Sequence, residues 1–241
     1  MTERKFTWSY SALTSFETCP RRHYETRVTK STREPEGAPL IFGNAAHKVL
    51  ENRVERGTPI PKVVQVTAAD GTTISQTSKG WEGMVESILS RATDDISVVT
   101  ERQICLDDRF IETDWLSQTA WVRGVIDVGL VGSTKALLLD YKTGKRKPDS
   151  DQLKLFAALA MHAWPKLERV VTGFLWLKTN QIDKETFTRS DIPNIWNDFL
   201  PRVQRMKQAF STNSWPERHS GLCKNWCPCI TCPHNGSYIN A

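Results

Sequence analysis

Gly124-Val125-Ile126-Asp127 and Leu138-Leu139-Asp140-Tyr141-Lys142-Thr143-Gly144 are the stretches that decide the fold. Apolar residues precede each aspartate, and a short polar turn separates the two runs, which predicts neighbouring strands that end near Asp127 and Asp140. Two carboxylates held close together repel each other, and their burial is costly unless a cation compensates. The pattern therefore predicts a site for Mg²⁺ or Mn²⁺, which prefer oxygen ligands.

Lys142 follows Asp140 by two residues, so on a strand both side chains project from the same face. Its ammonium group could orient or deprotonate a water molecule, or stabilise charge that builds up on a phosphate. The alternative is an ordinary salt bridge at the end of a strand. An isolated Asp-x-Lys pattern does not decide between these roles.

The rest of the chain predicts an α/β fold around this strand pair. Segments rich in β-branched and aromatic residues predict strands, with the 136–141 strand in the centre of the sheet because it is almost wholly apolar. These strands cover residues 98–106, 119–131, 136–141 and 170–177, with an edge strand at 185–188.

Apolar residues at helical spacing predict five helices between and around these strands. The first is capped by Ser9 and stops at Cys19-Pro20, the fourth is capped by Asp149 or Ser150, and the last starts at Ser190 or Asp191. They cover residues 10–19, 43–56, 81–89, 153–160 and 191–210. The polar stretches 29–39 and 63–80 are predicted to be a loop and a surface excursion.

The composition predicts one domain, since 241 residues with 39% hydrophobic content suit a single core or a core with a small appendage. We find neither an apolar leader at the start nor an apolar run long enough to span a bilayer, so we expect a soluble cytoplasmic protein. A net charge of +5, with clustered basic residues, suits a phosphate-rich partner but does not establish one.

Six cysteines are distributed unevenly along the chain. Without a secretory signal, the cluster near the end predicts metal binding before disulfides. Cys105 alternates within a predicted strand and is expected to be a small buried hydrophobic residue. The others are Cys19, Cys223, Cys227, Cys229 and Cys232.

These motifs resemble the PD-(D/E)XK nuclease superfamily, and in particular its RecB-like branch with the CRISPR-associated four-cysteine exonucleases and their short phage-encoded relatives. The matching stretches span nearly the whole chain in family order: Gly43-Asn-Ala-Ala-His47-Lys-Val-Leu-Glu51, Gly124 to Asp127, Asp140 to Gly144, and Gln152-Leu-Lys-Leu-Phe156. The resemblance implies a restriction-endonuclease-like core, with a mixed central sheet flanked by helices. It also implies a Mg²⁺- or Mn²⁺-dependent DNA exonuclease.

By this resemblance the metal ligands would be His47, Asp127, Asp140 and the main-chain carbonyl of Tyr141. Lys142 would be the catalytic lysine. Gln152, on the helix that follows the active-site strands, would be a further catalytic residue, directed at the substrate or at the architecture of the site. Phe156 departs from the family, which often has a tyrosine there. Glu51 and Glu101 are further candidates, although Glu51 could simply pair with Lys48, and an isolated histidine is more often packed or surface-exposed than a ligand.

The same resemblance implies that Cys19, Cys223, Cys227 and Cys232 hold a [4Fe-4S] cluster that joins the N- and C-terminal segments, residues 1–30 and 215–241. Four thiolates would equally suit a structural Zn²⁺. Cys229 could replace one of the three late cysteines. The spacing leaves both the metal and the fourth ligand open.

The expected substrate is DNA, mainly single-stranded or with free ends, in recombination, repair or phage DNA processing, in the host cytoplasm if the chain is phage-encoded. A helicase or recombination protein is an expected partner. The backbone contacts are assigned to basic side chains: Arg21, Arg22, Lys145, Arg146 and Lys147. Competing interpretations are a non-catalytic nucleic-acid-binding protein with structural zinc and a redox-sensing iron–sulfur protein. Both leave the intact Asp127, Asp140 and Lys142 without a role.

Overall fold

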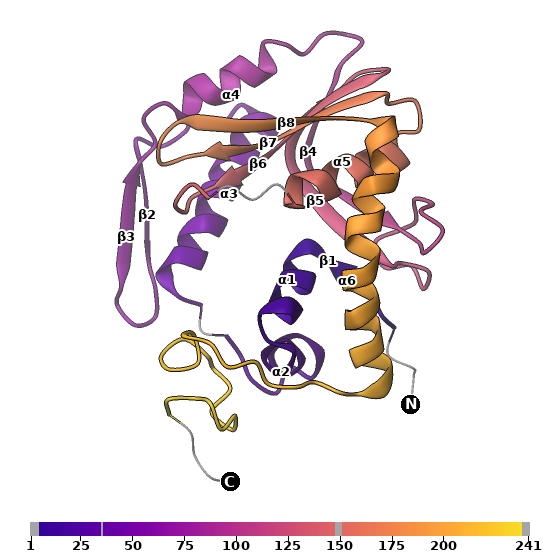
Figure 1. Ribbon diagram of the computed structural model, residues 1–241. Helices are drawn as coiled ribbons and strands as arrows, with labels where there is room; N and C mark the ends of the chain where they lie inside the picture. The colour runs from indigo at the N-terminus through magenta and orange to yellow at the C-terminus, as the bar shows by residue number, and fades with distance from the viewer. Residues whose placement is uncertain (1–4, 35, 148–150, 238–241) are drawn as a thin grey trace. The chain divides into compact units, whose positions relative to one another are not determined.

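The computed structural model describes residues 5–34, 36–147 and 151–237 (Figure 1). The chain divides into two compact units. The central unit is Glu36–Trp196, and the terminal unit combines Met1–Pro35 with Asn197–Ala241 from the two ends of the chain. None of the helices in the described ranges combines the length and apolarity that a membrane span requires.

A mixed sheet forms the middle of the central unit. It contains β4 (Ser97–Leu106), β5 (Val122–Val131), β6 (Lys135–Lys142), β7 (Arg169–Trp176) and β8 (Gln181–Thr188). The strands lie in this order, and only the β6–β7 pair is parallel. The apolar β6 strand is central and β8 lies at the edge, as predicted.

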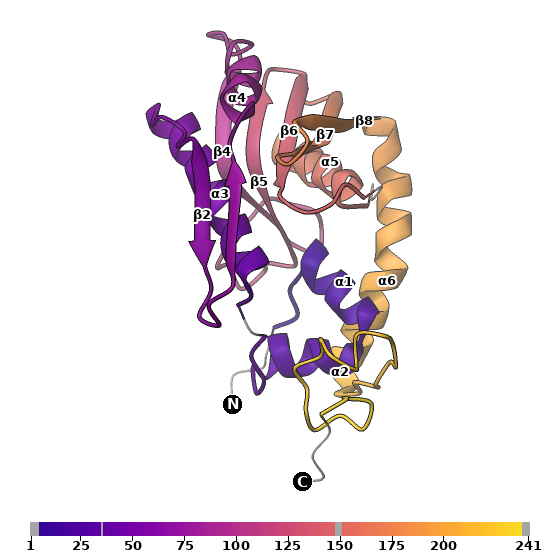
Figure 2. The same ribbon diagram turned by 90° about the vertical axis from the view of Figure 1, so that its left-hand side faces the viewer.

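Helices cover both faces of this sheet (Figure 2). On one face, α3 (Ala38–Arg56) and α4 (Trp81–Leu89) share a buried cluster with β5, β6 and β7. On the other, α5 (Asp151–Ala163) makes the crossover that the parallel β6–β7 pair requires. It packs so closely on β5 that a Cβ at Gly124 would lie 2.5 Å from Leu159 Cδ1.

Two segments of the central unit differ from their sequence predictions. The polar stretch predicted as a surface excursion forms a hairpin of β2 (Val63–Thr67) and β3 (Thr73–Thr77), because β-branched residues alternate on both sides of an Asp70-Gly71 turn. Gly71 has a φ of 83°, which favours glycine. Helix α3 begins before its predicted start, since Pro39 lies in its first turn, where proline needs no amide partner.

The terminal unit begins with a short strand, β1 (Trp8–Ser9), and α1 (Tyr10–Thr18). The Ser9 hydroxyl accepts a hydrogen bond from Ala12 N, so the predicted cap is confirmed. Cys19 is extended, and the chain then forms a short helix, α2 (Pro20–His23), and a π-helical turn, Tyr24–Val28, in place of a simple turn into a loop.

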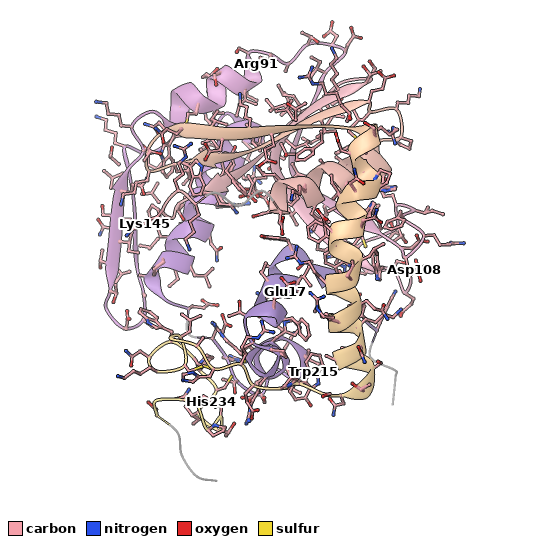
Figure 3. The ribbon with its side chains drawn as sticks, viewed as in Figure 1. Glu17, Arg91, Asp108, Lys145, Trp215 and His234 are labelled. Carbon is pink, nitrogen blue, oxygen red and sulfur yellow. The ribbon has the colours of Figure 1, made fainter. Side chains whose placement is uncertain are left out.

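The last helix, α6 (Ile192–Thr212), starts in the central unit and continues into the terminal unit. The start of this helix differs from the prediction, which placed it at Ser190 or Asp191. Thr188 instead caps a 3₁₀ turn, Arg189–Asp191, that precedes α6, and Asp191 completes the capping box of that turn. In the terminal unit, Arg202 donates to both carboxylate oxygens of Glu17, which Figure 3 labels. The caps predicted for α5, Asp149 and Ser150, lie outside the described residues.

Candidate active site

Asp127 and Asp140 lie side by side on β5 and β6, because the register pairs Val128 with Leu139. Both are buried, and Asp127 Oδ2 accepts a hydrogen bond from Tyr141 N at 2.7 Å. Burial and the negative charge of Asp127 raise the pKa of Asp140 to about 6, although Lys142 opposes the shift. The two carboxylates therefore meet as the sequence predicted.

Lys142, Asp140 and Gln152 form a closed ring of polar contacts. Lys142 Nζ lies 2.6 Å from Asp140 Oδ2 and donates to Gln152 Oε1 at 3.0 Å. Gln152 Nε2 in turn donates to Asp140 Oδ1 at 2.8 Å. The lysine is thus both a salt-bridge partner and a fixed cation at the site, and α5 supplies the amide that holds it.

His47 reaches the same site from α3. Its Nε2 lies 3.0 Å from the carbonyl oxygen of Tyr141, and its Nδ1 lies 3.4 Å from Asp127 Oδ2. Burial disfavours the imidazolium, but the adjacent Asp127 and the charge of Asp140 outweigh it, so the pKa of His47 is raised. The histidine therefore faces the two acids and the main-chain carbonyl.

Glu101 joins the site through an irregularity in β4. The β4–β5 register is the same before Glu101, where Thr100 pairs with Val128, and after it, where Arg102 pairs with Ile126, so Glu101 stands opposite Asp127; it has a φ of 44° and is itself unpaired. Burial, followed by the charge of Asp127, raises the pKa of Glu101. Glu51, by contrast, accepts a salt bridge from Lys48 at 2.6 Å, as its structural interpretation predicts.

These residues fit a divalent cation. Ligand atoms of His47, Glu101 and Asp127 all lie within 4.8 Å of one another, and no other such group occurs among the described residues. Together with the Tyr141 carbonyl oxygen, which lies 3.0 Å from His47 Nε2, they offer an imidazole, two carboxylates and a carbonyl, donors that Mg²⁺ or Mn²⁺ can bind. Asp140 lies outside the three-residue group, because Gln152 and Lys142 hold its oxygens.

The predicted DNA-binding residues are divided between the units. Lys145, Arg146 and Lys147 follow β6 beside the site, and Figure 3 labels Lys145. In the terminal unit, Arg21 pairs with Glu25 and Glu217, and Arg22 pairs with Glu34. Both of these arginines therefore contribute to the internal structure of their own unit.

The terminal unit brings the early and late cysteines to one cavity, which is lined by Cys19, Cys223, Cys227, Cys229 and Cys232. Burial and the neighbouring Cys227 raise the pKa of the Cys229 thiol, which is almost wholly buried. All six cysteines are free thiols, and no three of the described ones place their sulfurs within 4.8 Å of one another. Cys105 is buried in β4 as expected.

A family model described as the PD-(D/E)XK nuclease superfamily matches residues 7–234. No curated protein matches the chain. A crystal structure of a "Putative exonuclease" from Eubacterium rectale is 11% identical, with 92% of this chain and 86% of that chain covered and a TM-score of 0.51. The crystal structure of SSO0001 is 12% identical, with 100% of this chain and 90% of that chain covered and a TM-score of 0.42.

Proposed function

Because the chain belongs to the PD-(D/E)XK nuclease superfamily, we propose that it is a Mg²⁺- or Mn²⁺-dependent DNA exonuclease that prefers single-stranded ends. One observation carries this proposal. The site retains two buried, adjacent aspartates, a lysine fixed against one of them, and a histidine that faces the other. A degenerate, non-catalytic relative would have no need to keep this set.

His47, Glu101, Asp127 and the Tyr141 carbonyl would hold the cation, with Asp140 beside them. When bound, a divalent cation polarises the phosphate and lowers the pKa of a water molecule that attacks phosphorus. The clustered carboxylates favour its binding, since a cation offsets both the burial of the Asp140 charge and its repulsion by Asp127, which raise the pKa of Asp140. Glu101 is a proposed ligand because its carboxylate lies within 4.8 Å of the ligand atoms of His47 and Asp127.

Lys142 supplies the positive charge of the protein at the reacting phosphate. Its ammonium stabilises negative charge that builds up on the phosphate oxygens, or orients the attacking water. Gln152 accepts a hydrogen bond from this ammonium and so restricts where it points. Gln152 acts here as a positioning residue.

We also propose that the cysteine cavity holds a [4Fe-4S] cluster, with Zn²⁺ as the alternative. The support is the convergence of Cys19 with the late cysteines on one cavity. Cys19, Cys223, Cys227 and Cys232 are the proposed ligands. Cys229 also lines the cavity and is the alternative fourth ligand.

Digestion from an end is proposed from the resemblance, and the Eubacterium rectale neighbour carries the same description. We also propose that the protein acts in recombination, repair or phage DNA processing in the cytoplasm. Its proposed partner is a helicase or a recombination protein. All of these expectations depend on cleavage of DNA, which is tested first.

The test is digestion of end-labelled linear single-stranded DNA and its closed circular form with added Mg²⁺ or Mn²⁺. The wild-type chain should shorten the linear strand progressively and leave the circle intact, while Asp140→Asn and Lys142→Met should abolish cleavage. Lys166→Ala, an exposed lysine before β7, is the control and should cut like wild type. Full activity of purified Asp140→Asn would rule out the site, and equal cutting of both forms would rule out the requirement for an end.

A further inference from the structure

The early and late cysteines of the terminal unit are held in different ways. Cys223 and Cys227 are fixed within the C-terminal segment itself. Gly236 N donates to the Cys223 carbonyl oxygen at 3.2 Å, and Asn235 Nδ2 donates to the Cys227 carbonyl oxygen at 2.7 Å. Cys19 reaches the same cavity from the other end of the chain, so its position depends on contacts between the two segments.

Arg21, two residues after Cys19, bonds to the C-terminal segment at two separate places. Its Nη1 donates to Glu217 Oε1 at 2.6 Å, and its main-chain N donates to the carbonyl oxygen of Pro216 at 3.3 Å. Its Nη2 donates to the carbonyl oxygen of Thr231 at 3.0 Å. One residue therefore joins the start of the C-terminal segment, the end of its cysteine cluster and the early cysteine.

Three partners hold the guanidinium of Arg21 in one orientation. Nε donates to Glu25 Oε1 at 2.9 Å, while Nη1 and Nη2 are engaged by Glu217 and Thr231. The Glu25 side chain is mostly buried, so this ion pair is fixed within the unit. A lysine presents its donors from a single point and could not reach all three partners, so the contacts require the planar fork of arginine.

Arg21 also lies close to the sulfur of Cys232, the residue after Thr231. Burial raises the pKa of the Cys232 thiol, and a main-chain hydrogen bond at His234 and the charge of Arg21 oppose this rise. A thiolate is the form of cysteine that binds a metal. The guanidinium therefore favours the ligand electrostatically as well as holding its segment in place.

These contacts argue against the sequence-based assignment of Arg21 to the DNA backbone. Its side chain is only 25% exposed, and two carboxylates, Glu25 and Glu217, already balance its charge. A phosphate that approached the guanidinium would be repelled by both of them.

We propose that Arg21 is a positioning residue for the metal centre: it holds the segment that carries Cys19 against the segment that carries Cys232, so that their thiolates bind one metal centre. This inference rests on the proposed metal centre and adds the residue that assembles it from the two ends of the chain.

The test measures how fast the anaerobically purified, full-length chain releases its metal to an excess of a coloured chelator for ferrous iron or zinc. Loss of a residue that holds a metal ligand in place costs about 10- to 100-fold in metal affinity. Arg21→Gln removes both the charge and the fork and should release metal about 10 to 100 times faster than wild type. Arg21→Lys keeps the charge, but it should also release metal faster because one ammonium cannot span the three partners.

Two controls separate this role from a general loss of stability. Ser9→Ala removes the cap of α1 and so weakens the same unit, but Ser9 does not line the cysteine cavity. Arg33→Gln removes an exposed cation of the same unit. Both variants should release metal at the wild-type rate, and denaturant unfolding records how much each substitution destabilises the chain.

Equal release by Arg21→Gln and Arg33→Gln from metal-loaded protein would overturn the positioning role and leave the metal centre itself standing. Release by Ser9→Ala as fast as by Arg21→Gln would attribute the effect to stability and would also overturn it. Wild-type retention by Arg21→Lys would overturn the requirement for the fork. Absence of both iron and zinc from the wild-type chain would overturn this inference together with the proposed metal centre.

Discussion

Gln152 contacts both members of the Lys142–Asp140 pair, so its removal should release both at once. We expect Gln152→Leu to lower kcat about 10- to 100-fold, the equivalent of a lost hydrogen bond to a charged group, and to change KM little. Steady-state kinetics on linear DNA measures this split. Gln65→Leu on the exposed β2 strand is the control. A pure rise in KM would show that Gln152 binds substrate and does not position Lys142.

His23 makes the stability of the terminal unit depend on pH. It is buried near Phe16 and Trp215, and burial, followed by the charge of Arg27, lowers the pKa of His23 to about 4. The unfolded chain then binds a proton more readily than the folded one. The free energy of unfolding therefore has its full value above about pH 6.5 and decreases as the pH falls toward 4. By pH 5 the loss should be about 2 kcal/mol.

Denaturant unfolding at pH 7 and pH 5 tests this prediction. His23→Phe should reduce the difference in the free energy of unfolding between pH 7 and pH 5, whatever its effect on stability at pH 7. His219→Gln, which replaces an exposed histidine of the same unit, should keep the wild-type difference. An equal loss of stability in His23→Phe and wild type would place the sensitive group elsewhere.

The Asp140–Lys142 pair was predictable from the sequence, whereas Glu101 was only a further candidate. Asp140 and Lys142 follow from the two-residue period of a strand, which needs no tertiary information. Glu101 has a positive φ within a segment, Val98-Val99-Thr100-Glu101-Arg102, that the sequence predicts to be a regular strand. Residues other than glycine rarely adopt a positive φ, and no residue type in this segment indicates one.

Strand β7 has no space for a side chain at Gly173, where it pairs with β8. A Cβ there would lie 2.6 Å from the carbonyl oxygen of Asp183 and 3.0 Å from Leu139 Cδ2. Gly173→Ala should destabilise the central unit by about 1 to 3 kcal/mol, because the sheet must shift to accept the methyl group. Thermal or denaturant unfolding measures the change.

Gly83→Ala provides the matched control for this substitution. Gly83 lies inside α4, and a Cβ there meets nothing within 4 Å. Alanine favours a helix over glycine by about 0.8 to 1 kcal/mol, so this variant should be more stable than wild type. Equal destabilisation by the two substitutions would show that the close approach at Gly173 is not the cause.

Long helices and strands with a clear hydrophobic period were predictable from the sequence, whereas short, mostly polar strands were not. The strands that became β4 to β8 and the helices that became α3, α4 and α5 follow from apolar spacing. The β2–β3 hairpin was missed because most of its residues are polar and exposed, and only Val64, Val66 and Ile74 mark the face that packs on the core. The turn chemistry of Asp70-Gly71 was the available local signal.

At the scale of the whole molecule, the cysteine cavity predicts one metal centre in the terminal unit. Cys19→Ser and Cys232→Ser should each reduce bound metal strongly, whereas Cys105→Ser, in the central unit, should retain it. Anaerobic purification followed by iron and zinc analysis and visible absorption measures this. Brown protein with iron supports [4Fe-4S], colourless protein with stoichiometric zinc supports Zn²⁺, and the absence of both metals would refute a metal centre.

The terminal unit is assembled from the two ends of the chain, with the whole central unit between them. A ribosome that adds about 5 to 20 residues per second needs roughly 10 to 40 s to travel the 204 residues from Cys19 to Cys223 (223 − 19 = 204). During that interval the central unit can already fold, while α1 and Cys19 must wait for their partners. The order of synthesis therefore makes completion of the cysteine cavity a late event, and newly made chains are exposed to thiol oxidation at Cys19 before the late cysteines arrive.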